Sequence, residues 1–349
     1  MQLIINFVET KILKKILIPF KPFYWILISL KNKLYDLNIL NTYSLNKPVI
    51  SLGNLTTGGT GKTPFTIFIT KYFIKHGIKV GILSRGYGRK SKGTIVVSDG
   101  IKLLNSYKKT GDEPYLIAKK LKNIPIVVDK DRFRGGTYLI TKFNPDIIIL
   151  DDGYQHRSLK RDLNILLINS LDKKNDHKLI PNGKLREPWE NFKRANLIIK
   201  TKSNLIKKNK FLIDKINKTK INTFNSEFHI KISEQFTKKA FKNINLSNKN
   251  ILTVTAIGDP ISFIESIKKM NCNIIKQINF KDHYNYNQKI WNKIENIVKK
   301  FKIDFILTTE KDWVKIEPLV INVPIIIFEL DIIINNTKKF YKTLNNLIN

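Results

Sequence analysis

Short apolar runs alternate with segments of helical spacing along most of the chain. Runs rich in apolar and β-branched residues predict strands beginning at Val49 and at 79–84, 94–97, 124–128, 146–150, 163–168 and 197–199. A helix is predicted from Pro64 to near Gly77, where glycine suits a C-cap. Strands that alternate with helix-sized segments favour a parallel sheet covered on both faces.

The same alternation returns after a looser stretch. Residues 221–250 are rich in Lys and Asn, with one alternating piece at 227–232 that suits a linking strand. Beyond it we predict strands at 251–255, 274–278, 305–308 and 324–328 and helices at 261–270 and 286–300. We therefore expect an N-terminal helical region over 1–35, a larger domain over 36–220, a linker over 221–250 and a smaller α/β domain over 251–349.

A glycine-rich segment follows the first strand, in the order of strand, phosphate loop and helix. Its glycines let backbone N–H groups surround a polyphosphate, Lys62 brings a positive charge, and the Thr63 hydroxyl can bind Mg²⁺. Thr56 stands where the usual pattern has its first glycine, so the match is Walker-like. Such turns also close ordinary βα units, but Gly-Lys-Thr after a buried strand favours nucleotide binding. The predicted nucleotide-binding residues are Thr56, Thr57, Gly58, Gly59, Thr60, Gly61, Lys62 and Thr63.

Two adjacent acids end the predicted strand at 146–150. Asp151 and Asp152 follow four apolar residues, a position that suits an Mg²⁺-holding element beside a phosphate loop. Successive side chains of a strand point to opposite faces. We therefore expect one carboxylate to bind the metal and the other to bind a water, a helix N-cap or the loop.

The charge of the chain is strongly positive. It has 62 Lys+Arg against 28 Asp+Glu, a formal net charge of +34, which would favour nucleic acid or an anionic membrane as partner. The density of Lys, Asn and Ile over 200–250 indicates a compositional bias and a solvated surface, so we expect no nucleic-acid partner. Cys272 is the single cysteine, which excludes a disulfide framework and a thiolate metal site and fits a reducing compartment.

The N-terminal region has the composition of a membrane-surface segment. Residues 16–30 are apolar apart from Lys21, but the run is shorter than the roughly 20 residues of a spanning helix. Pro19 and Pro22 interrupt it, and no small-residue cleavage site follows. Lysines around Phe20, Phe23, Tyr24 and Trp25 predict a helix lying in the interface of an anionic leaflet. The alternative is an N-terminal helix packed on the core.

Together the motifs resemble the tetraacyldisaccharide 4′-kinase family, the lipid kinases of lipid A synthesis in Gram-negative envelopes. The resemblance covers nearly the whole chain and rests on residues 53–64, 84–89, 111–114, 151–156, 179–188, 280–284 and 308–312. It implies an α/β fold, with a P-loop NTPase-like parallel-sheet domain, a second, smaller α/β domain and an N-terminal membrane-associating helix. The implied reaction moves the γ-phosphoryl of ATP, with Mg²⁺, to the 4′-hydroxyl of an acylated glucosamine disaccharide 1-phosphate, giving lipid IVA. The implied location is the cytoplasmic face of the inner membrane.

Roles for charged residues outside the loop follow from this reaction. Asp112, at a predicted helix start, is our candidate base for the sugar hydroxyl. The resemblance implies His283 as its partner, reaching across from the second domain when a cleft closes. Arg132 and Arg186 are expected to meet phosphate charge. Glu113 and Glu187 are expected to orient the arginines, the metal shell or the acceptor. Lys62 and the loop amides would hold the β- and γ-phosphates, with Thr63 and Asp151 or Asp152 on the metal.

Two other classes of protein remain as alternatives at this point. A regulatory P-loop ATPase that dimerises on membranes would carry a second lysine at position 57, where this chain has Thr57. A basic nucleic-acid-binding module is favoured only by the net charge, and it predicts a steep salt dependence of binding to any polynucleotide.

Overall fold

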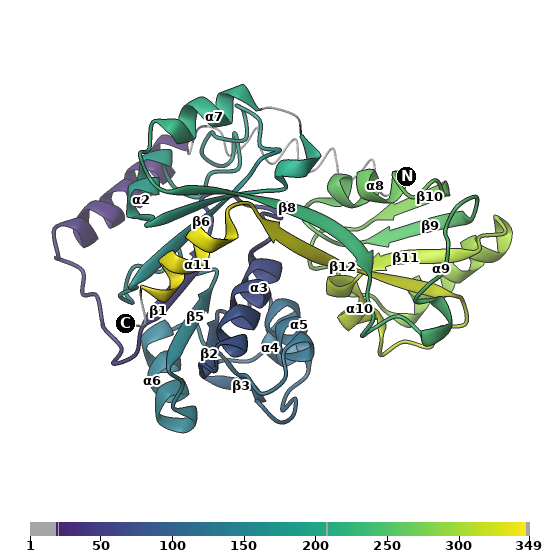
Figure 1. Cartoon of the computed structure of the whole chain (residues 1–349), viewed down its shortest axis with the longest axis horizontal. Coiled ribbons are helices and arrows are strands. Elements are labelled where there is room, and N and C mark those ends of the chain that lie inside the picture. The colour runs from purple at the N-terminus through teal and green to yellow at the C-terminus, as the bar shows by residue number, and fades with distance from the viewer. Residues whose placement is uncertain (1–18, 20, 207–208, 347–349) are drawn as a thin grey trace. The chain divides into compact units, whose positions relative to one another are not determined.

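The computed structural model describes residue 19 and residues 21–206 and 209–346, and Figure 1 labels its elements. It is a mixed α/β structure with a large, mostly parallel sheet, which confirms the predicted fold class. The chain forms two compact units. The first consists of the described residues up to 62, residues 147–226 and those from 334 onward, and the second of residues 63–146 and 227–333.

Strand β1 (Val49–Gly53) lies between two other strands of the first unit. It pairs in parallel with β5 (Ile147–Asp151) on one side and β6 (Leu163–Asn169) on the other. Strand β7 (Leu197–Thr201) pairs in parallel with β6, and the start of β8 (Thr223–Ile232) pairs in parallel with β7. All residues of β1, β5 and β6 are buried, which explains their unbroken apolar runs.

Helices and turns complete the first unit. They are α2 (Lys21–Asp36), α7 (Lys210–Asn217) and α11 (Thr337–Asn345), with the 3₁₀ turns η2 (Trp189–Arg194) and η3 (Ser203–Leu205). An apolar cluster that includes Tyr154, Leu166 and Trp189 takes in Leu212 of α7, and Tyr24 of α2 packs against it. Helix α2 is therefore anchored to the same core that supports β6 and β7. The part of the N-terminal prediction that concerns residues 1–18 lies outside the described residues.

The second unit begins with α3 (Lys62–Lys75), whose first residue closes the phosphate loop. It continues with β2 (Val80–Ser84), β3 (Ile95–Asp99), α4 (Tyr107–Thr110), α5 (Asp112–Lys120), β4 (Pro125–Val128) and α6 (Arg132–Phe143). Strands β2 and β4 are parallel, but β3 runs antiparallel to β4, unlike the prediction of parallel strands. Only two residues of β3 are buried, and a half-exposed strand suits antiparallel pairing better than parallel pairing.

The rest of the second unit repeats the strand and helix alternation. Strands β9 (Asn250–Thr255), β10 (Asn273–Asn279), β11 (Phe305–Thr309) and β12 (Ile325–Ile334) are parallel in the order β10-β9-β11-β12. Helices α8 (Pro260–Lys268), α9 (Gln288–Lys300) and α10 (Glu310–Ile316) and the turn η4 (Lys239–Phe241) accompany them. Trp291 of α9 is fully buried in the apolar cluster of this part.

The predicted elements exist, and most of their ends shift by one or two residues. Two strands differ more. Strand β8 begins at Thr223, earlier than the sequence pattern predicted, and strand β12 ends at Ile334, later than predicted. Strand β12 continues beyond Phe328, its predicted end, because ion pairs with Lys120 and Lys231 compensate the negative charge of the next residue, Glu329. The predicted domain boundaries stay a prediction. Within the described part of the chain, no helix combines the length and the apolar character needed to cross a bilayer.

Candidate active site

The glycine-rich loop leaves the buried end of β1 and returns at Lys62, the first residue of α3. Gly58 and Gly61 have φ values of 107° and 86°, in the left-handed region where glycine is favoured. The buried amide of Asn54 donates to the Thr60 hydroxyl at 2.9 Å, which ties the two ends of the loop together. The loop therefore has the strand, turn and helix context that the phosphate-loop prediction requires.

Lys62 is held by two acceptors at the entrance of this loop. Its Nζ donates to Asn54 Oδ1 at 3.3 Å and lies 3.8 Å from Asp152 Oδ1. From β7's end, Lys202 donates to the Gly59 carbonyl oxygen at 2.8 Å. Asn54 and Lys202 were not among the predicted site residues. Asn54 stands inside the quoted motif, but nothing in the sequence near Lys202 points to the loop.

The two adjacent acids at the end of β5 have different surroundings. Asp151 is the last residue of β5 and is 1% exposed, next to Leu52 of β1 in the parallel register. Asp152 follows with a φ of 50° and lies against two cations, Lys62 and Arg186, the latter at 3.1 Å. Asp151 is therefore enclosed at the end of the strand, whereas Asp152 lies in a cluster of charges.

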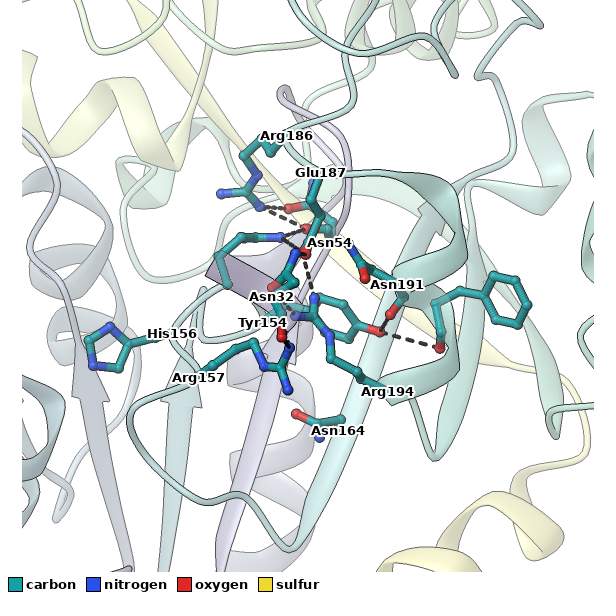
Figure 2. Close-up of polar contacts among 12 residues, drawn as sticks. Asn32, Asn54, Tyr154, His156, Arg157, Asn164, Arg186, Glu187, Asn191 and Arg194 are labelled. Atoms are coloured by element: carbon teal, nitrogen blue, oxygen red, sulfur yellow. Dashed lines mark hydrogen bonds and ion pairs between the residues drawn. The ribbon is translucent and has the colours of Figure 1, made fainter. Parts of the chain in front are cut away.

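Arg186 and Glu187 lie in a turn that is bonded to the residues before the phosphate loop (Figure 2). The Arg186 backbone N–H donates to the Leu55 carbonyl oxygen at 2.8 Å, and its guanidinium donates to the Asn54 carbonyl oxygen at 2.9 Å and to Asp152. This places Arg186, Asp152 and Lys62 in one group of charges around Asn54. The predicted residues Lys62, Asp152 and Arg186 thus come together although they are far apart in sequence.

Glu187 is 1% exposed, and arginines compensate its charge. Arg194 Nη2 donates to its Oε1 at 2.6 Å, and Gln155 Nε2 donates to the same oxygen at 2.7 Å. Burial, with Arg194 and Arg157 nearby, lowers the pKa of Arg161 to about 10, a sign of how much positive charge gathers here. The arginine that Glu187 contacts is Arg194 and not Arg132 or Arg186, so its expected role in the reaction stays a prediction.

Asp112 and His283 form a hydrogen-bonded pair inside the second unit. His283 Nδ1 lies 2.9 Å from Asp112 Oδ2 and 3.0 Å from Oδ1. Asp112 is the first residue of α5 and is buried, and His283 is held at a φ of 61°. We expected the two to belong to different domains and to meet on closure, and the contact exists here without such a closure. Both belong to one compact unit and are already in contact.

Two lysines of α10 surround this pair. Lys311 bridges Glu113 at 3.0 Å and Asp282 at 3.1 Å, the residues that follow Asp112 and precede His283. Lys315 Nζ is 1% exposed and lies 3.7 Å from Asp112 and 3.6 Å from Asp312. Neither lysine was predicted as a site residue. Residues 308–312 served only for the family resemblance, although a Glu-Lys-Asp sequence at a helix start was a signal for charge pairing.

The charges around the pair shift both of its pKa values. Burial raises the pKa of Asp112, but the hydrogen bond from His283 and the nearby Lys311, His283 and Lys315 charges outweigh it and lower that pKa to about 2. Burial lowers the pKa of His283, but the Asp112 hydrogen bond and charge outweigh it, so that pKa is raised above its ordinary value. An ionised Asp112 beside a readily protonated imidazole is the resting arrangement.

Arg132 occupies a different kind of position. It begins α6, is 2% exposed, and its Nη1 donates to the carbonyl oxygens of Asp129 at 2.5 Å and Lys130 at 3.2 Å. These bonds fix the loop that connects β4 to α6. Its expected contact with phosphate stays a prediction.

Comparison with known proteins decides the family. The family model described as tetraacyldisaccharide-1-P 4′-kinase, LpxK, matches residues 13–349. The chain belongs to this family. Curated relatives named tetraacyldisaccharide 4′-kinase include one from Aquifex aeolicus, 36% identical over 305 residues, and one from Pelobacter propionicus, 34% identical over 343 residues. The alignments cover 87% and 96% of this chain and 90% and 93% of those relatives.

A solved structure supports the same assignment. The crystal structure of LpxK from Aquifex aeolicus in complex with ATP matches with a TM-score of 0.76 and 32% sequence identity. The match covers 97% of this chain and 100% of that chain. Members of the family are lipid kinases, and this membership excludes the two alternatives kept open from the sequence.

The Asp112–His283 pair should make the stability of this chain's second unit depend on pH. Because the pKa of His283 is raised in the folded state, the protonated imidazole stabilises the fold at pH values below its unfolded pKa of about 6.5. This stabilisation is lost as the pH rises through the pKa of the folded state. A depressed Asp112 pKa stabilises it above about 3.9 and ceases to do so as pH falls to about 2. We therefore expect Asp112→Asn to lower the melting temperature more at pH 5.5 than at pH 9. Equal losses at the two pH values would contradict the pairing.

Proposed function

We propose that this chain transfers the γ-phosphoryl of ATP to the 4′-hydroxyl of tetraacyldisaccharide 1-phosphate, giving lipid IVA in lipid A biosynthesis. Family membership over nearly the whole chain supports the reaction class. The observation that carries the site is the group formed by Lys62, Asn54, Asp152 and Arg186 at the phosphate loop. Cations fixed at the end of a phosphate loop suit a polyphosphate and not a neutral ligand.

The proposed reaction needs charge neutralisation more than covalent help, because the transition state of phosphoryl transfer is loose. Lys62 and the loop amides hold the β- and γ-phosphates, and Arg186 meets developing phosphate charge. Arg132 is a second candidate for phosphate contact. The oxygen of the 4′-hydroxyl bonds to the γ-phosphorus, the bond to the β,γ-bridging oxygen breaks, and ADP leaves.

Asp112 is the proposed acceptor of the hydroxyl proton. The lowered pKa keeps the Asp112 carboxylate ionised. His283 Nδ1 lies 2.9 Å from Asp112 Oδ2 and 3.0 Å from Asp112 Oδ1. A carboxylate with a pKa of about 2 is a weak base. The proposal therefore relies on the position of Asp112 beside the attacking oxygen more than on its basicity. Glu113, whose Oε1 accepts from Lys311, is proposed to orient the acceptor.

The residues at the loop also fit Mg²⁺, which would supply positive charge to neutralise the polyphosphate. The Thr63 hydroxyl and the Asp151 and Asp152 carboxylates are the oxygen donors that this ion prefers. Asp152 is already shared by Lys62 and Arg186. Asp151, buried at the end of β5, and Asp152 therefore both remain candidates for the carboxylate ligand.

The membrane part of the proposal rests on helix α2. Phe23, Ile26, Leu27 and Leu30 have the spacing of one helical face and are between 50% and 62% exposed. An exposed apolar stripe next to lysines suits insertion into an anionic leaflet, here the cytoplasmic face of the inner membrane. Tyr24 on the other side of α2 packs against the apolar cluster of the first unit, as the core-packing alternative expected, and the exposed stripe supports the membrane proposal.

We expect replacement of Ile26, Leu27 and Leu30 by Ser to weaken binding to phosphatidylglycerol vesicles more than tenfold. Burying one such side chain contributes about 1.5 to 3 kcal/mol, and 1.4 kcal/mol is tenfold in affinity. Vesicle sedimentation measures the change, with Ile101→Ser, at a 93% exposed site, as the matched control. If high salt alone released the unaltered protein, charge and not apolar insertion would hold it.

Transfer of radiolabel from [γ-³²P]ATP to tetraacyldisaccharide 1-phosphate in mixed micelles tests the reaction. The proposal predicts one ADP formed for each labelled lipid, and no labelled lipid without the acceptor. ATP hydrolysis that continues equally without the acceptor would overturn it and favour a simple ATPase.

A further inference from the structure

Helix α2 has a second face that points into the first unit. Tyr24 and Asn32 lie on it, while the apolar stripe defined above lies on the exposed side. The Tyr24 hydroxyl donates to the Arg186 carbonyl oxygen at 2.5 Å. Asn32 is 7% exposed, an uncommon burial for an asparagine in a helix that carries exposed apolar residues elsewhere. The inward face therefore touches the turn that carries Arg186 and Glu187.

Asn32 uses its amide and its backbone carbonyl in this contact (Figure 2). Its Nδ2 donates to Glu187 Oε2 at 3.3 Å, on the carboxylate oxygen opposite the one that Arg194 and Gln155 bind. Its Oδ1 accepts from Arg194 Nη1 at 3.3 Å, and its backbone oxygen accepts from Arg157 Nη1 at 2.8 Å. One side chain thus orients a buried carboxylate and the arginine that neutralises it.

The Glu187 carboxylate is connected in turn to the phosphate loop. Gln155 Nε2, bonded to Glu187 Oε1 at 2.7 Å, also donates to the Asn54 carbonyl oxygen at 2.8 Å. The Asn54 side chain accepts from Lys62 Nζ at 3.3 Å. A continuous set of hydrogen bonds therefore runs from Asn32 through Glu187, Gln155 and Asn54 to Lys62, entirely within the first unit.

We propose that Asn32 is a positioning residue for Glu187 in the kinase reaction, so that helix α2 forms part of the active-site framework as well as a membrane contact. This inference rests on the proposed function. In the proposed reaction, Asn32 contacts neither the nucleotide nor the acceptor lipid. Its amide sets the direction of the Glu187 carboxylate and shares Arg194 with it. Removing this amide takes a donor from Glu187 Oε2 and an acceptor from Arg194, so the direction of the buried carboxylate is no longer fixed through that oxygen.

The test is a double-mutant cycle on kcat with Asn32→Ala and Glu187→Asp. The shorter aspartate keeps the charge but withdraws its oxygens from Asn32. Asn32→Ala alone should lower kcat about tenfold or more, as substitutions behind a functional carboxylate do, with a KM for ATP changed less than kcat. In a chain that already carries Glu187→Asp, adding Asn32→Ala should lower kcat by less than a further factor of about two. Asn41→Ala, an exposed asparagine beyond the same helix, is the matched control and should keep wild-type kcat.

Several outcomes separate this inference from its alternatives. Equal fold-losses from Asn32→Ala in both backgrounds, or losses that follow the melting temperature, would make Asn32 a structural residue only and overturn the proposal. Vesicle binding of Asn32→Ala should equal that of the unaltered chain, and its loss together with kcat would assign the effect to membrane docking. If the unaltered chain itself transferred no phosphoryl group, the proposed function would fail first. An active unaltered chain with an unaffected Asn32→Ala variant would overturn the inference alone.

Discussion

Lys62→Ala should lower kcat about a thousandfold, since removal of one well-placed group that stabilises transition-state charge costs about 10² to 10³. Lys62 begins α3, and its ammonium contacts the polar groups of Asn54 and Asp152 at the loop. The positive charge is therefore expected to meet the β- and γ-phosphates, and its removal changes polar contacts at the loop. The melting temperature should change little. Steady-state transfer kinetics with melting curves measure both quantities.

A control separates the loop charge from the general charge of the helix. Lys71→Ala removes an exposed lysine of the same helix α3 and should leave kcat unchanged. Normal turnover of Lys62→Ala with an unchanged circular dichroism spectrum would remove the phosphate-loop assignment. A loss of equal size in the Lys71→Ala variant would point to helix stability instead.

Asp112→Ala and His283→Ala should each lower kcat by about 10² to 10⁴, the range for a positioned proton acceptor. Their carboxylate and imidazole are in direct contact, so they act as one unit and the losses should not add. The double variant should be little worse than the poorer single variant. ATP binding should survive in all three, because the residues of the phosphate loop are unchanged.

The competing explanation treats Asp112 as a helix-start carboxylate and His283 as a structural residue. In that case the damage would follow thermal stability, since Asp112 also faces Lys315 and its neighbour Glu113 binds Lys311. Glu317→Gln, which breaks an exposed ion pair between α10 and Lys119 of α5, is a control for simple loosening of these helices. Additive losses in kcat, or losses that the control reproduces, would contradict the pair's proposed role.

Local sequence patterns were sufficient for the elements and for the loop. The periodicity of apolar residues located the buried strands because both faces of β1, β5 and β6 are covered. Gly58 and Gly61 located the phosphate loop because their φ values need glycine. Strand β12 was predicted too short, since Glu329 looks like a strand end until Lys120 is known to neutralise it.

Contacts between distant residues were beyond such patterns. Asp112 and His283 are 171 residues apart and Asn32 and Glu187 are 155 apart, so no local periodicity encodes either contact. The resemblance to a family supplied the first pair but placed its members in separate domains, whereas they share one unit. Asn32, Asn54, Lys202 and Lys315 were missed because their roles depend on which charges the fold brings next to them.

The position of the transferred phosphate tests the central claim most directly. After reaction with ATP, Mg²⁺ and tetraacyldisaccharide 1-phosphate, ¹H–³¹P correlation spectroscopy of the purified lipid shows which carbon bears each phosphate. The account predicts one new monoester phosphorus that correlates with the proton on C4′, and none after reaction with Lys62→Ala. A new phosphorus at any other position, or free inorganic phosphate without a phosphorylated lipid, would contradict it.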